Sequence, residues 1–197
     1  MSLTSTISNN LNLYNGCPQV TLDQQTKWGN NIHRIVEDIF ENDLQQVPSY
    51  VDECSLYWVS AARATEIKIK ANIKATSIEE TVKWNTGQYG IWTIRTDIVG
   101  TYHGTPCIMD IKATKNLNKQ AVQAQLSAYA YAIMARDNVS APQLLCLHLP
   151  MDDLGELIKI DLMDYSELLD FLKNNTVEGV ECWEGSNWNP ASDHKIW

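Results

Sequence analysis

The residue types most able to carry chemistry lie in the stretch TIRTDIVGTYHGTPCIMDIK, residues 93–112. Its apolar and polar alternation and the turn pair His103-Gly104 predict two β-strands joined as a hairpin. Asp110 and Lys112 are two positions apart, so they project from one face of the second strand. Hairpin pairing brings Asp97, on the first strand, beside them. We therefore expect two carboxylates and one ammonium group to converge at one place.

Burial of two carboxylates and an ammonium group restricts the kinds of site that they can form. Carboxylates that are removed from water are costly unless a cation lies between them, and Mg²⁺ prefers oxygen ligands of this kind. The sequence therefore indicates a divalent-metal site at the hairpin. Two other interpretations stay open from the residues alone. Asp97 could form a surface ion pair with Arg95, and Asp110 with Lys112 could be a solvated strand end.

The elements before the hairpin are predicted from the spacing of apolar residues. Residues 29–41 have helical spacing, and a second helix is expected from Tyr50 to about Thr65, after the break at Pro48-Ser49. The stretch EIKIKANIK that follows fits either a strand edge or the end of that helix. After Ser77, period-two alternation predicts a strand with four residues on one face: Ile78, Glu80, Val82 and Trp84.

Beyond the hairpin, apolar periodicity predicts a helix, two strands and a last helix, at residues 119–136, 143–149, 156–162 and 165–173. Asn118 suits the N-cap of the first of these helices. This order of elements predicts an α/β fold with a central mixed β-sheet flanked by helices. We expect one domain over residues 27–182, between an irregular leader at 1–26 and a Trp-bearing tail at 183–197.

Composition narrows the classes of protein. No apolar run is long enough to cross a bilayer and the N-terminus lacks a signal-peptide pattern, so we expect a cytoplasmic protein without a membrane partner. The five cysteines have no CxxC spacing, which favours free thiols over disulfides or a zinc site. The formal charge of -9 at pH 7 opposes nucleic-acid binding, so a local basic lip or bound cations would have to offset it.

Four motifs together resemble those of the PD-(D/E)XK nucleases, in the RecB-like branch that includes phage recombination exonucleases. They are Gly-x-x-x-His at Gly29 and His33, an Asp late in a central strand at Asp97, Asp-x-Lys at Asp110 to Lys112, and Gln-x-x-x-Tyr at Gln125 and Tyr129. Each motif is weak alone, but their order and intervals match. The resemblance implies a restriction-endonuclease-like core over residues 29–149 and metal-dependent hydrolysis of phosphodiester bonds.

The resemblance also implies a ligand set. Asp97 and Asp110 would hold Mg²⁺ or Mn²⁺, with the backbone carbonyl of Ile111 as a third oxygen ligand. His33 would be a further ligand, and because imidazole is softer than carboxylate, Mn²⁺ is expected to serve as well as Mg²⁺. An iron-sulfur cluster, which some relatives carry, is not expected, because only Cys17 and Cys182 lie in the regions that would supply its four cysteines.

Three further side chains take catalytic roles in this resemblance. Lys112 would orient the attacking water and offset charge in the transition state. Gln125 and Tyr129 lie one helical turn apart and can point at the same place, near the metal or the DNA backbone. For Tyr129 a purely structural role, as a core aromatic with its hydroxyl at a polar site, stays open. Without the other motifs, His33 would be a core or capping residue.

Two acidic residues are weaker candidates. Glu37, one turn after His33, could hydrogen-bond the imidazole, although a solvated helix face is its simpler interpretation. Glu80 shares a predicted strand face with Val82 and could reach the site, with Glu79 as its competitor.

The function that these expectations favour is a DNA exonuclease of phage recombination or repair type. DNA would be its substrate, a recombination or replication protein its partner, and a homo-oligomer around duplex DNA its source of processivity. If it is encoded by a phage, it would act in the host cytoplasm. Two alternatives are a structure- or sequence-directed endonuclease and a non-catalytic accessory protein that keeps the nuclease fold. The acidic net charge favours the last, and the intact Asp97, Asp110 and Lys112 set opposes it.

Overall fold

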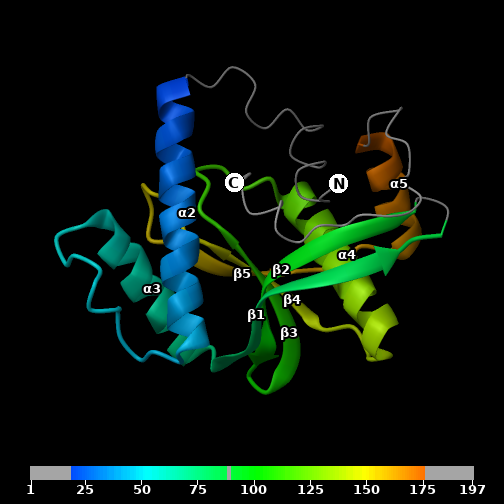
Figure 1. Ribbon diagram of the computed structural model, residues 1–197, viewed down its shortest axis with the longest axis horizontal. Coiled ribbons are helices and arrows are strands. Elements are labelled where there is room, and N and C mark those ends of the chain that lie inside the picture. Colours follow the sequence, from blue (N-terminus) through cyan, green and yellow to red (C-terminus); the bar gives the residue numbers. More distant parts are fainter. Residues whose placement is uncertain (1–18, 88–89, 176–197) are drawn as a thin grey trace, which may run out of the picture.

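A central five-stranded sheet organises the molecule, a computed structural model that describes residues 19–87 and 90–175. The strand order is β1-β2-β3-β4-β5; β3 and β4 are parallel, and the other neighbours are antiparallel. Helices α2 and α3 cover one face of the sheet, and α4 with α5 cover the other (Figure 1). The predicted α/β fold, a mixed sheet flanked by helices, is confirmed. The elements are α2 Gln19–Glu41, α3 Leu56–Lys70, β1 Ile73–Asn85, β2 Ile91–Tyr102, β3 Thr105–Lys112, α4 Lys119–Asp137, β4 Gln143–His148, β5 Glu156–Ile160 and α5 Tyr165–Asn175.

The helices before the sheet differ from the predicted bounds. Helix α2 begins at Gln19, so the expected irregular leader at 1–26 is wrong from that residue on, and residues 1–18 lie outside the described part. Helix α3 begins after Ser55, whose side chain caps the helix by accepting a hydrogen bond from the Trp58 N–H at 3.3 Å. The start predicted at Tyr50 is therefore wrong. The helix continues to Lys70 and β1 follows at Ile73, so the ambiguous stretch is divided between the two.

Strand β1 changes its facing in the middle. Val82 and Trp84 pack in the core beneath α4, whereas Ile78 packs in the core beneath α2 and α3. The prediction that Ile78 shares a face with Val82 is therefore wrong. Glu79, whose φ of 53° is left-handed, lies between these positions, and the paired strand β2 makes the same change between Ile94 and Ile98. This change of facing lies beside the candidate site.

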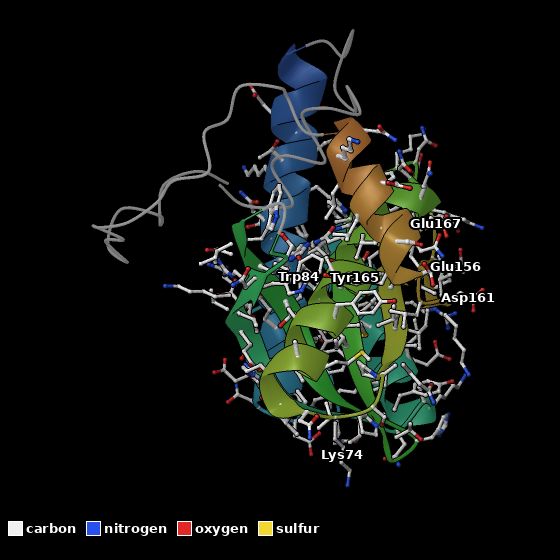
Figure 2. The ribbon with its side chains drawn as sticks, turned by 90° about the vertical axis from the view of Figure 1, so that its right-hand side faces the viewer. Lys74, Trp84, Glu156, Asp161, Tyr165 and Glu167 are labelled. Carbon is white, nitrogen blue, oxygen red and sulfur yellow. The ribbon has the colours of Figure 1, made fainter. Side chains whose placement is uncertain are left out.

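The core beneath α4 extends to α5 through aromatic contacts. Tyr165, at the start of α5, makes edge contacts with Trp84 of β1 and Tyr131 of α4, at centroid distances of 6.2 and 5.0 Å. Figure 2 shows Trp84 and Tyr165 together on this side of the molecule. Leu168 and Leu172 of α5 are buried in the same core, so α5 holds α4 against the sheet.

None of the described helices is long and apolar enough to span a bilayer.

Candidate functional site

The candidate site lies where strands β2 and β3 separate. The two strands pair from Tyr102 opposite Thr105 up to Ile98 opposite Met109, and the ladder stops one step before Asp97 would face Asp110. At that point the Ile111 N–H donates to Asp97 Oδ2 at 2.6 Å, so a carboxylate replaces the missing strand partner. The expected placement of Asp97 beside the end of β3 is confirmed.

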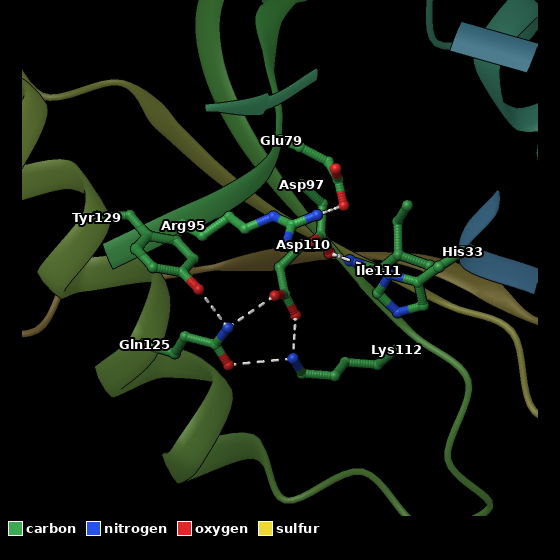
Figure 3. Close-up of polar contacts among 9 residues, drawn as sticks. All are labelled: His33, Glu79, Arg95, Asp97, Asp110, Ile111, Lys112, Gln125 and Tyr129. Atoms are coloured by element: carbon green, nitrogen blue, oxygen red, sulfur yellow. Dashed lines mark hydrogen bonds and ion pairs between the residues drawn. The ribbon is translucent and has the colours of Figure 1, made fainter. Parts of the chain in front are cut away.

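Asp110 and Lys112 join a buried network with helix α4 (Figure 3). Lys112 Nζ lies 2.7 Å from Asp110 Oδ2 and donates to Gln125 Oε1 at 3.0 Å. Gln125 Nε2 donates to Asp110 Oδ1 at 2.9 Å and to the Tyr129 hydroxyl oxygen at 2.6 Å. Asp110 is only 1% exposed. The solvated strand end considered from the sequence is therefore wrong, because the structure buries this charge in a hydrogen-bonded network.

Helix α4 can approach the sheet because its facing residues are small. Ala124, Ala128 and Ala132 are almost fully buried, and Asn118 caps the helix by accepting from the Ala121 N–H at 3.1 Å. The predicted cap is confirmed. Gln125 and Tyr129, one turn apart, are both buried against the site. Tyr129 combines the structural role and the site role considered for it, because its ring packs in the core and its hydroxyl accepts a hydrogen bond in the network.

Helix α2 brings His33 to the opposite side of the site. Trp28 of this helix donates through Nε1 to the Leu149 carbonyl at 3.3 Å, which ties α2 to the chain just after β4. His33 Nδ1 lies 3.8 Å from Asp97 Oδ2. Burial raises the pKa of Glu37, which His33 opposes, and the nearby Asp97 raises it further. Both predicted α2 residues therefore lie within electrostatic reach of the site, and their roles stay predictions.

The two central charges alter each other's ionisation. Burial raises the pKa of Asp110 to about 6, although the Lys112 ammonium acts against this shift and Asp97 adds to it. Burial alone would lower the pKa of Lys112, yet Asp110 and Asp97 together raise it above its ordinary range. Lys112 therefore stays a cation. A permanent ammonium can hold a water or a phosphate oxygen in place, but it cannot accept a proton.

The donor types at the site fit a divalent cation. Asp97, Asp110 and His33 supply two carboxylates and an imidazole, which Mg²⁺ or Mn²⁺ accepts. Asp110 Oδ2 is buried, and among the described residues its charge is balanced by the Lys112 ammonium 2.7 Å away. Within the described ranges, no three His, Cys, Asp or Glu side chains are already grouped closely enough to hold a metal. Binding would therefore require these side chains to move.

Two acidic residues of β1 lie differently from the expectation. Glu80, the predicted candidate, shares its face with Val82 but forms an ion pair with Arg136 at the end of α4. Its competitor Glu79 instead pairs with Arg95, beside Asp97 in Figure 3. The anticipated ion pair between Asp97 and Arg95 does not form, because Glu79 takes the guanidinium. Strand alternation could have placed Arg95 on the face of Asp97, two residues away, but Glu79's conformation has no sequence signal.

Comparisons with known proteins give little further guidance. No family model and no curated protein matches the chain. Among solved structures, a proposed exonuclease from Eubacterium rectale is 12% identical, with a TM-score of 0.45 over 75% of this chain and 63% of that one. The protein SSO0001 is 17% identical, with a TM-score of 0.38 over 73% of this chain and 70% of that one. The chain thus spans less than two thirds of the first of these, and likeness at this level does not identify its function.

The buried network leads to a stability prediction at Gln125. Gln125→Ala removes hydrogen bonds to Asp110, Lys112 and Tyr129, and should lower the free energy of unfolding by about 1–3 kcal/mol. Urea unfolding of the metal-free protein measures the effect. Gln123→Ala is the control, because this amide of the same helix donates to an exposed backbone carbonyl, that of Asp161, and its loss should stay within about 0.5 kcal/mol. Equal losses in the two variants would contradict the prediction.

Proposed function

We propose that this chain is a divalent-metal-dependent nuclease that hydrolyses phosphodiester bonds in DNA. The observation that supports it most is the buried set of Asp110, Lys112 and Gln125, closed on one side by Tyr129 and faced by Asp97 on the other. An ion pair buried in this way contributes little to stability, because desolvation of the two charges offsets their attraction. A catalytic use accounts for charges that stability alone does not explain.

The metal would be held by Asp97, Asp110 and His33, with the Ile111 carbonyl as a further oxygen ligand. When bound, the metal supplies polarisation of the phosphoryl oxygen and a more acidic water. Asp97 is already oriented by the Ile111 N–H, and Asp110 by the Gln125 amide.

Lys112 would act as a fixed cation beside the scissile phosphate. An ammonium group has three N–H donors, and Asp110 and Gln125 take two of them within the described part of the chain. The third can be directed at the attacking water or at a phosphoryl oxygen, where it offsets the charge that grows in the transition state. Gln125 is a positioning residue, since it touches Lys112, Asp110 and Tyr129 at once.

The finer proposal is an exonuclease of phage recombination or repair type that acts in the cytoplasm. It rests on the four motifs and on no contact in the structure. An endonuclease would use the same residues, because the path of DNA to the site, and not the metal centre, sets the mode of cleavage. A partner protein of recombination or replication and a homo-oligomer belong to this finer proposal.

The test is a titration of Mg²⁺ and of Mn²⁺ with end-labelled linear DNA and closed circular DNA. We expect linear DNA to be degraded in either metal, circular DNA to be spared, and EDTA to abolish cleavage. Cutting of the circle would favour the endonuclease. The absence of metal-dependent cleavage on DNA and on RNA would contradict the proposed function.

A further inference from the structure

An exposed arginine lies at the edge of the proposed site. Arg95 precedes Asp97 by two residues on β2 and is paired in register with Thr81 of β1. Its guanidinium forms an ion pair with the Glu79 carboxylate, and the two side chains are 40% and 44% exposed. Figure 3 shows this pair beside Asp97 and Asp110. Solvent, and therefore a ligand, can reach the guanidinium.

The backbone of Glu79 is strained where it meets this arginine. Apart from glycines and Glu79, four of the described residues have a positive φ. They lie in turns or at a helix end: Asp43, Asn72, His103 and Asn138. Glu79 has this conformation inside a strand. A left-handed residue costs roughly 1–2 kcal/mol, whereas an exposed ion pair contributes about 0–1 kcal/mol. Stability therefore does not explain the arrangement, and strain of this kind gathers at functional sites.

The acidic residues near Arg95 would repel a nucleic acid, so a positively charged group is needed where the nucleic acid approaches the site. Asp97, Asp110 and Glu37 lie around the site, and the chain carries a formal charge of -9 at pH 7. Arg95 acts against the rise in the pKa of Glu37, so its charge reaches helix α2. Lys112, by contrast, is turned inward to Asp110 and Gln125. Arg95 thus supplies positive charge at the exposed edge.

We infer that Arg95 binds a backbone phosphate of the nucleic acid next to the one that is cut, and that Glu79 occupies the guanidinium until substrate arrives. This inference rests on the proposed function. A guanidinium presents parallel N–H donors that match a phosphate as well as a carboxylate. The Glu79 carboxylate therefore substitutes for the phosphate within the chain. Because the pair is exposed, its separation costs little.

The test measures binding without cleavage, with a fluorescein-labelled duplex oligonucleotide in Ca²⁺ and again in EDTA, over a series of salt concentrations. Arg95→Ala should weaken binding and reduce the slope of log K against log salt by about 0.9, the value for one lost phosphate contact on duplex DNA. Arg136→Ala is the control, since this arginine is 42% exposed and also pairs with a β1 glutamate, Glu80. It should keep the parent slope.

Glu79→Gln supplies the opposite result. Removal of the competing carboxylate should tighten binding severalfold at low salt, and Arg95→Ala in the same chain should cancel this gain. A parent slope in Arg95→Ala would overturn the inference, and if DNA were still cut the proposed function would stand. If Arg95→Ala had a reduced slope but the parent showed no metal-dependent cleavage, the phosphate contact would be supported and the proposed nuclease activity would be overturned. A parent chain that binds no nucleic acid would overturn both.

Discussion

Lys112→Ala should lower the rate of metal-dependent DNA cleavage by about 10²–10³-fold, the effect of removing one donor that stabilises transition-state charge. The ammonium lies 2.7 Å from Asp110 Oδ2 and is held by Gln125, and a water that takes its place would not reproduce its charge. Single-turnover cleavage of end-labelled linear DNA in saturating Mg²⁺ measures the chemical step.

Three comparisons make this result specific. Lys119→Ala removes an exposed lysine at the start of α4 and should cleave as fast as the parent. Lys112→Met keeps the aliphatic stem and loses the ammonium with its charge and its N–H donors, so it should be as slow as Lys112→Ala. Both Lys112 variants should still bind Mg²⁺, because the proposed ligands are kept. A Lys112→Ala variant that is folded by circular dichroism and cleaves at the parent rate would refute the mechanism.

The site could be predicted from sequence where its geometry follows from local rules. The turn at His103-Gly104, which the structure places in the left-handed region, fixes the hairpin register. That register puts Asp97 beside the end of β3. Asn118 likewise fixes where α4 begins, and helical spacing then turns Gln125 and Tyr129 to one side. Each of these steps needs only neighbouring residues.

The predictions from sequence fail where the conformation or the partner of a residue depends on residues far away in the chain. Glutamate has no preference for positive φ, so nothing in the sequence signals the left-handed Glu79 or the change of facing that places Ile78 in the other core. Glu80 forms an ion pair with Arg136, which is far along the chain, and the pattern of a single sequence cannot reveal such a distant partner. The sequence suggests only Asp97 as the partner of Arg95, because the ion pair with Glu79 depends on the unusual backbone of that residue.

Asp110→Asn should lower the affinity for Mg²⁺ and for Mn²⁺ by at least about 10²-fold, and cleavage should fall with it. Loss of a group that merely supports a ligand costs 10–100-fold in metal affinity, so loss of the ligand's charge should reach the upper end of that range or exceed it. Asparagine keeps the shape of the side chain and an oxygen for the Gln125 amide, which donates at 2.9 Å. The other side-chain atom becomes an amide nitrogen that faces the Lys112 ammonium, so circular dichroism must first show that the variant is folded.

Isothermal titration calorimetry with each metal measures this loss, and Asp170→Asn, at an exposed position of α5, is the matched control. The comparison with Lys112→Ala separates the two roles, because one variant should lose metal and activity together and the other activity alone. If Asp110→Asn bound Mg²⁺ as the parent does, Asp110 would not be a ligand. Its burial beside Lys112 would then serve only to hold the ammonium, and the metal would have to be sought among Asp97, His33 and Glu37.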